Sequence, residues 1–180
     1  MEVNQMPKDT QHALITWIPQ STDGKREAIN LNNLYRDYSV LIDLNKLTTS
    51  EVSKYMSLIV VGHHSEFLNE TLENLVKVVQ GSDCTWIVLA MCDSGTTKYY
   101  GTLENNELWS KAQKLSNRLK IKVSGTMRPL TFDEVGKGLA FALTLTEILI
   151  RSNPAMDSQL WKDFEPQNDV DEIIEGFKNI

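Results

Sequence analysis

Two apolar stretches decide the fold of this chain: LIVVGHH over residues 58–64 and WIVLAMCDSG over residues 86–95. Each begins with a continuous apolar run and lacks the alternation of a strand that has one face in water. Such runs are typical of strands that are buried on both faces of a parallel sheet. We therefore predict two buried strands, one that ends at His63 and one that ends at Cys92.

The rest of the chain alternates between short apolar runs and segments with helical periodicity. Strands are predicted at residues 12–18, 40–42 and 121–123, and helices at residues 25–37, 48–55, 68–79 and 108–119. Residues 19–24 carry turn chemistry and are predicted to form a loop. Strands and helices that alternate in this way form βαβ units, which build a mainly parallel sheet with helices on both faces. The predicted fold class is α/β, as a three-layer α/β/α sandwich.

The C-terminal part of the chain gives weaker signals. Residues 138–150 fit a strand or a helix, and their length without a turn signal favours a helix. Trp161 and Phe164, with Leu160, are predicted to anchor a loop that covers the sheet edge. A terminal helix is predicted after Asn168.

The sequence shows no repeat and no convincing linker, so a second domain is not expected. We predict one domain over residues 1–180. Within it, residues 1–11 are expected to form a flexible N-terminus. Residues 152–180 are expected to form a C-terminal loop and helix that pack on the domain.

Composition excludes several classes of partner. The net charge of −6 argues against binding to nucleic acid or to an anionic membrane, since both are bound by clustered Lys and Arg. No run of eighteen apolar residues exists, and the N-terminus lacks the apolar core of a signal peptide. Cys84 and Cys92 lie at opposite ends of one predicted strand and cannot pair within it. We therefore expect a reducing setting, either the cytoplasm or a host cytosol into which the protein is delivered.

His63 and Cys92 are the strongest candidates for chemistry. They are 29 residues apart with one predicted helix between them, so they are expected at the carboxyl ends of neighbouring parallel strands. A thiol needs a nearby base to supply thiolate, and histidine is the usual one. Backbone N–H groups near the two residues would hold an oxyanion. Gly62 and Gly95 would let the backbone approach a substrate closely.

Other interpretations of these residues compete with catalysis. A cysteine that ends an apolar strand is commonly a small buried hydrophobe, and a histidine there often caps a loop. Asp43 ends another predicted strand and is a candidate for orienting His63 or His64, although solvating a loop is a commoner role. No CxxC or HxxxH spacing supports a metal site, and no glycine-rich phosphate loop is present.

The two strand-end motifs resemble those of the caspase-type clan of cysteine peptidases. One reads Val60-Val61-Gly62-His63, and the other reads Leu89-Ala90-Met91-Cys92-Asp93-Ser94-Gly95. The cysteine motif is most similar to that of CHAT-domain proteases. Residues 120–125 and 129–137 look more like the self-processing protease domain of large bacterial toxins. The resemblance covers roughly residues 57–137.

The resemblance implies a caspase-like sheet and a cysteine endopeptidase that acts on a protein or peptide. His63 takes the role of general acid/base and Cys92 that of nucleophile. Five neighbours are expected to line the substrate or the oxyanion: Gly62, His64, Asp93, Ser94 and Gly95. We expect no cofactor, because the inositol hexakisphosphate of the toxin proteases needs a strongly basic pocket and the basic residues of this chain are scattered.

Two alternatives come from other functional classes. The clan usually has glycine directly after its histidine, where this chain has His64. One alternative is therefore a catalytically inactive caspase-like domain that binds proteins. The other is a flavodoxin-like binding domain in which the histidine and the cysteine are incidental. The sequence does not specify the oligomeric state.

Overall fold

A computed structural model describes residues 9–99, 102–103, 109–127 and 161–167 of the chain. Its helices are α1 (Thr22–Leu34), α2 (Thr49–Val52), α3 (Asn69–Val79) and α4 (Lys111–Leu119), with 3-10 helices η1 (Leu44–Lys46) and η2 (His64–Glu66). Its long sheet contains β1 (Asp9–Trp17), β2 (Ser39–Leu41), β3 (Tyr55–Val61), β4 (Trp86–Ala90), β7 (Lys122–Thr126) and β8 (Trp161–Phe164). β5 (Lys98–Tyr99) and β6 (Thr102–Leu103) form a separate antiparallel pair.

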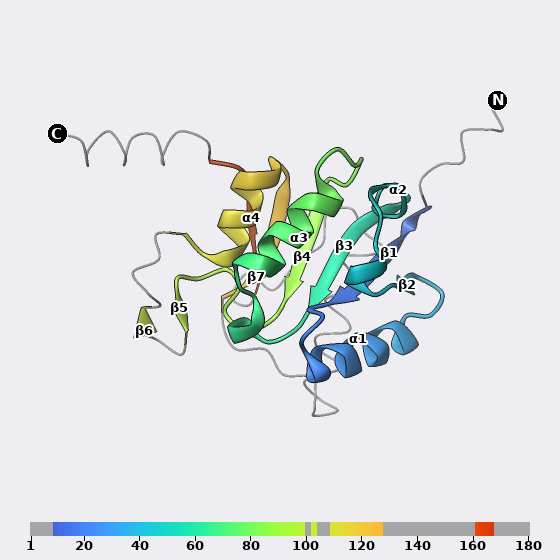
Figure 1. The fold of residues 1–180 in the computed structure, drawn as a ribbon, viewed down its shortest axis with the longest axis horizontal. Coiled ribbons are helices and arrows are strands. Elements are labelled where there is room, and N and C mark those ends of the chain that lie inside the picture. Colours follow the sequence, from blue (N-terminus) through green and yellow to red (C-terminus); the bar gives the residue numbers. More distant parts are fainter. Residues whose placement is uncertain (1–8, 100–101, 104–108, 128–160, 168–180) are drawn as a thin grey trace.

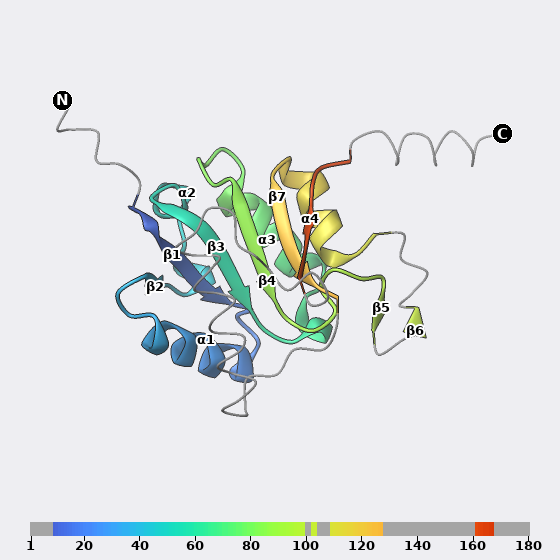
Figure 2. The same ribbon diagram turned by 180° about the vertical axis from the view of Figure 1, so that it is seen from behind.

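The long sheet confirms the predicted α/β class. Its strand order is β2-β1-β3-β4-β7-β8, and every neighbouring pair is parallel except β7 with β8. α3 and α4 lie in front of the sheet in Figure 1 and behind it in Figure 2. α1 packs on the opposite face, so the sheet is the middle layer of three.

Alternating residues of the central strands build two separate cores. In β3, Leu58 and Val60 pack with α3 and α4, whereas Ile59 and Val61 pack with α1. All four side chains are buried, which explains why the strand reads as a continuous apolar run. The covered sheet leaves only its strand ends and loops to form a site.

α1 begins three residues before its predicted start, and the difference matters for the site. The Ser21 side chain accepts a hydrogen bond from the Gly24 N–H at 2.8 Å, which caps the helix. Thr22, Asp23 and Gly24 therefore form the first helical turn, and the loop prediction for these three residues is wrong. Ser21 followed by an acidic residue in the next turn is a helix-start signal that the turn residues obscured.

β8 replaces the loop that was predicted around Trp161 and Phe164. Both side chains are buried, while Lys162 and Asp163 between them are exposed. The segment pairs antiparallel with β7, and Asp163 accepts a hydrogen bond from the Ser124 hydroxyl. Trp161 and Phe164 thus cover the sheet edge, as predicted, but as a strand.

Other elements lie near their predicted positions, although Tyr55, predicted at the end of a helix, begins β3 because α2 ends at Val52. Thr48 caps α2, and Gly81 after α3 has a φ of 82°, a left-handed conformation that glycine adopts without strain. Residues 9–11, expected in the flexible N-terminus, belong to β1. The helices predicted over residues 138–150 and after Asn168 lie outside the described residues. No helix in the described part of the chain is long and apolar enough to cross a membrane.

Candidate functional site

The tips of β3 and β4 bring His63 and Cys92 to one crevice. The two strands are parallel neighbours, as predicted, and Val61 pairs with Ala90. His63 and Cys92 each follow two residues later, so they leave the sheet at the same level. We call the pocket there the His63 crevice, and its lining residues are Asp23, Gly24, Glu27, Val61, Gly62, His63, Met91 and Cys92.

Asp23 is the carboxylate that contacts His63. Its Oδ2 lies 2.9 Å from His63 Nε2, and both side chains are about half exposed. A carboxylate only accepts hydrogen bonds, so Nε2 donates to Asp23, and Nδ1 is the acceptor that the capping box with the Glu66 N–H uses. The hydrogen bond from His63, together with the charge of Arg26, lowers the pKa of Asp23 below its ordinary value of 3.8.

Two glycines let the start of α1 approach the tip of β3. A Cβ on Gly24 would lie 3.0 Å from the Gly62 Cα, and a Cβ on Gly62 would lie 2.6 Å from Ile18 Cδ1. Gly62 therefore lines the crevice as expected, but the space that it leaves is filled by Ile18. This close approach carries Asp23 to His63 across 40 residues of sequence.

Asp43, the predicted orienting residue, has another role. Its carboxylate accepts a hydrogen bond from the Asn45 N–H at 2.9 Å and caps η1. It follows β2, which is separated from β3 by β1. The sequence predicted a carboxylate partner for His63 but placed it after β2. It missed Asp23, because that residue was assigned to a loop.

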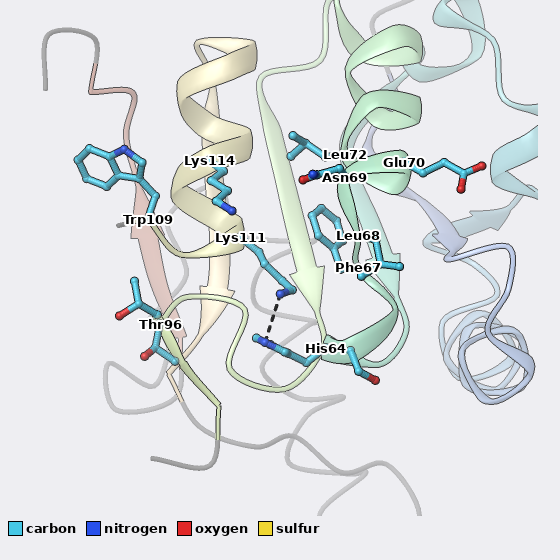
Figure 3. A pocket seen from close by; sticks show the side chains of 12 residues that line it. His64, Phe67, Leu68, Asn69, Glu70, Leu72, Thr96, Trp109, Lys111 and Lys114 are labelled. Atoms are coloured by element: carbon cyan, nitrogen blue, oxygen red, sulfur yellow. Dashed lines mark hydrogen bonds between the residues drawn. The ribbon is translucent and has the colours of Figure 1, made fainter. Parts of the chain in front are cut away.

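His64 is buried, with 1% of its surface exposed, and supports the main chain of Cys92. Its Nδ1 lies 2.8 Å from the Cys92 carbonyl oxygen, and its Nε2 lies 3.2 Å from Lys111 Nζ (Figure 3). A carbonyl accepts and an ammonium donates, so this arrangement assigns the donor role to Nδ1 and the acceptor role to Nε2. Both ring nitrogens are thus engaged, and His64 positions the Cys92 backbone instead of lining the crevice.

Ser94, expected to line a substrate site, is not among the residues that line the His63 crevice. Its side chain is fully buried, and its hydroxyl donates to the Leu89 carbonyl oxygen at 2.9 Å. The Thr126 N–H donates back to the same hydroxyl at 2.9 Å. Ser94 therefore fastens the turn after β4, which contains Cys92, to β7.

Asp93 and Gly95 also serve the turn. Asp93 is buried and has a φ of 52°, a left-handed conformation that aspartate adopts more readily than most residues. The Gly95 N–H donates to the Thr126 carbonyl oxygen, and a Cβ on Gly95 would lie 2.9 Å from the Phe164 ring. The absence of a Cβ at Gly95 thus allows its close packing against β7 and β8.

The expected backbone donor at His63 is already engaged. The His63 N–H donates to Glu66 Oε1 at 3.0 Å, in the first turn of η2. This amide does not serve an oxyanion unless Glu66 moves.

The two cysteines occupy different environments. Both are free thiols; Cys84 is buried, with 4% of its surface exposed, whereas Cys92 is partly exposed. The Cys84 thiol donates to the Trp86 carbonyl oxygen at 3.5 Å. Among the described residues, no group of three or more His, Cys, Asp or Glu side chains is arranged to hold a metal ion.

A second and larger pocket lies beside His64. We call it the His64 cavity; it has a volume of about 360 Å³. Its lining residues are His64, Ser65, Phe67, Leu68, Asn69, Glu70, Leu72, Thr96, Thr97, Trp109, Lys111 and Lys114. Sequence reasoning did not find it, because its walls come from separate elements, η2 with α3 on one side and the start of α4 on the other.

Comparison with known proteins adds no assignment. No protein-family model matches this sequence, and no curated protein matches it.

Proposed function

We propose that the chain is a cysteine endopeptidase of the caspase-like type, with Cys92 as nucleophile and His63 as general acid/base. The observation that carries the proposal is the His63 crevice, which joins a partly exposed thiol to a histidine that is oriented by a carboxylate. Nucleophile, base and orienting group are the three parts that thiol catalysis needs.

The hydrogen bonds of His63 define its direction of proton transfer. Because Nε2–H is held by Asp23, Nδ1 is the nitrogen that would accept the Cys92 thiol proton, after it releases the Glu66 N–H that the His63 side chain accepts in its capping box. The thiolate then attacks the peptide carbonyl carbon and forms a C–S bond. As the C–N bond breaks, His63 returns its proton to the leaving amine. Water hydrolyses the thioester, which regenerates the thiol and releases the acid.

The sheet topology allows one other ligand class, and the charge of the crevice disfavours it. The order β2-β1-β3-β4 is also that of flavodoxin-like folds, whose phosphate-bearing ligand binds where the strand order reverses, between β1 and β3. The His63 crevice lies at this point. Its lining includes the carboxylates of Asp23 and Glu27, which repel a phosphate.

A catalytically inactive protein-binding domain of the same fold is the second candidate. One observation favours it: the His63 N–H is held by Glu66 and is not available to an oxyanion. The two candidates differ in what they require of Cys92. Catalysis requires a reactive Cys92 thiol, whereas protein binding requires only the surface of the domain.

The decisive experiment labels the native protein with iodoacetamide between pH 5 and pH 9 and locates the adducts by peptide mapping. We expect Cys92 to react faster than free cysteine at neutral pH, and His63→Ala to slow the reaction about tenfold or more. Buried Cys84 is the internal reference and should react only on unfolding. Labelling of Cys92 no faster than free cysteine would remove the nucleophile from the proposal.

Turnover needs a separate measurement. A mixed peptide library incubated with the protein should yield cleaved products that are absent with Cys92→Ala. If Cys92 labels rapidly but Cys92→Ala leaves the cleavage pattern unchanged, the thiol is reactive without being catalytic. A partner that is captured equally by the wild type, Cys92→Ala and His63→Ala would support the inactive domain.

A further inference from the structure

The His64 cavity has the size of a small-molecule site. Its volume of about 360 Å³ falls in the lower part of the range for ligand pockets, roughly 300–1,000 Å³. It is separate from the His63 crevice, because the two pockets share no lining residue.

Positive charge gathers on one wall of this cavity. Lys111 and Lys114 lie one turn apart at the start of α4, and Figure 3 shows their side chains directed towards α3. In the same view the Glu70 carboxylate points away from the two lysines. Both lysines already interact with other residues of the protein, Lys111 with His64, and an anionic head group would add to these contacts.

The opposite wall adds backbone donors. The N-cap residue of α3 is Leu68, whose side chain cannot accept a hydrogen bond, and Asn69 begins the helix. The first amides of a helix have no partner within it, and the helix dipole is positive at this end. An anion between α3 and α4 would thus meet lysines on one side and a helix N-terminus on the other.

Apolar side chains complete the lining. Phe67 and Leu72 are buried parts of the core that also face the cavity, and Leu68 at its edge has 64% of its surface exposed. Leu68 is the most exposed large hydrophobic residue among those the structure describes. A purely inorganic anion would leave this apolar surface uncovered, whereas a ligand with an apolar body would bury it.

We propose that the His64 cavity binds a small organic anion. A carboxylate or phosphate head group contacts Lys111 and Lys114, and an attached apolar body lies on Phe67 and Leu72. This site is independent of the proposed peptidase, since its lining includes neither Cys92 nor His63.

The test is isothermal titration calorimetry of the whole chain with three probes of similar size: 3-phenylpropionate, phenyl phosphate and neutral 3-phenyl-1-propanol. We expect saturable binding of at least one anion and much weaker binding of the alcohol. The stronger anion identifies the head group as carboxylate or phosphate. Equal binding of the alcohol and the anions, or no saturable binding of either anion at millimolar concentration, overturns the proposal.

Variants place the binding in the cavity. Lys114→Met should weaken the anion about tenfold, as expected for loss of one charge-assisted contact, and should leave the alcohol unchanged. Lys46→Met is the matched control, because it removes the same charge from exposed η1 at the β2 edge. Equal weakening by both substitutions would indicate a general charge effect and contradict the assigned site.

Amide chemical shifts provide a readout that does not depend on a variant. On addition of the stronger anion, the ¹⁵N–¹H signals of Thr96, Thr97 and Leu68 should move, and those of Gly24 and Gly62 should not. The same result is expected with Cys92→Ala, so failure of the peptidase proposal leaves this one testable. Shifts centred on Gly24 and Gly62 would place the anion in the His63 crevice and overturn the cavity assignment.

Discussion

His63 and His64 are adjacent in sequence, but they differ in solvent exposure, in hydrogen-bond partners and in the pocket that each one lines. His63 has about half of its side chain exposed and contacts a carboxylate, whereas His64 is buried and lies between a carbonyl oxygen and an ammonium group. His63 shares the crevice with the Cys92 thiol. His64 lines the cavity on the other side and holds the Cys92 carbonyl oxygen.

The difference arises from the backbone at the end of β3. His63 is extended, with a φ of −91° and a ψ of 147°, and His64 begins η2. Consecutive side chains of an extended backbone point to opposite sides, so two identical residues enter different pockets. The second histidine therefore supports the Cys92 backbone and lines the His64 cavity instead of the His63 crevice.

Removing the thiol or its base should give the largest effect. Cys92→Ala and His63→Ala should each lower peptide cleavage by roughly 10³-fold or more, since both act on the reacting atoms. Neither should change the free energy of unfolding by much, because both side chains are partly exposed. Cleavage rates and urea denaturation of each variant are the measurements.

The matching control for this prediction is Cys84→Ser. It removes the buried thiol, so a loss of stability with retained cleavage is expected. Equal loss of cleavage with Cys84→Ser would show that the assay reports folding and not chemistry.

His64→Ala should produce the opposite pattern. The substitution leaves a cavity and removes the donor to the Cys92 carbonyl in a partly buried hydrogen bond, which together cost about 2–4 kcal/mol of unfolding free energy. His64→Asn can keep a donor near the Nδ1 position and should recover part of this loss. Urea denaturation measures both variants. If His64→Ala is stable but inactive, and His63→Ala retains activity, the two histidines exchange roles.

Asp23→Asn should have an intermediate effect on cleavage. The amide still accepts from His63 but has no charge to stabilise an imidazolium, so we expect a fall of roughly tenfold. The pKa of Asp23 is lowered below 3.8, so its carboxylate is ionised above that pH. The effect of this charge on His63 is therefore complete above pH 3.8 and is lost as the pH falls through the lowered pKa. The defect should therefore persist from pH 8 to pH 5.

Asp43→Asn is the matched substitution for Asp23→Asn, since it changes the other candidate carboxylate in the same way. It should leave cleavage unchanged across this pH range. A defect with Asp43→Asn equal to that with Asp23→Asn would contradict the assignment of Asp23.

The smallest effect is expected at the Glu73–Arg118 pair, which joins α3 to α4 beside the His64 cavity. Arg118 donates two hydrogen bonds to Glu73, at 2.6 and 3.1 Å, and both side chains are about half exposed. Arg118 lowers the pKa of Glu73 from its ordinary value of 4.5. The stabilisation of the fold by this ion pair is therefore present above pH 4.5 and is lost as the pH falls through the lowered pKa of Glu73.

Glu73→Gln should lower the thermal midpoint slightly at pH 7, and the difference should shrink below pH 4.5. Glu51→Gln, which removes the exposed partner of Lys54, is the control for general surface charge. A larger fall for Glu73→Gln than for His64→Ala would mean that the exposed ion pair stabilises the fold more than the buried histidine does.

The sequence predicted the fold well where the physical signal was local. Continuous apolar runs identified β3 and β4, and Thr48 and Gly81 marked helix ends through their capping chemistry. The prediction failed where the strand with which a segment pairs is distant in the chain. β8 read as a loop anchor because its pairing with β7 joins segments that lie far apart in the chain.

The candidate site shows the same division. The sequence paired His63 with Cys92 through strand adjacency, and the structure confirms that adjacency. Ser94 and Gly95 were expected at a substrate, but they face β7 because of hydrogen bonds and packing with Thr126. Asp23 and the His64 cavity were missed, since each depends on elements that meet only after folding.

By itself the sequence determined a parallel α/β sheet that places a histidine and a cysteine at neighbouring strand ends. That much follows from apolar runs and their spacing, which are properties of consecutive residues. Only the tertiary structure decided which histidine shares a crevice with Cys92, which carboxylate contacts that histidine, and that a second cavity lies beside His64. These depend on contacts such as Asp23 with His63 and Lys111 with His64, which join residues 40 or more positions apart. Local preference cannot encode such contacts, because they exist only when the helices have packed on the sheet.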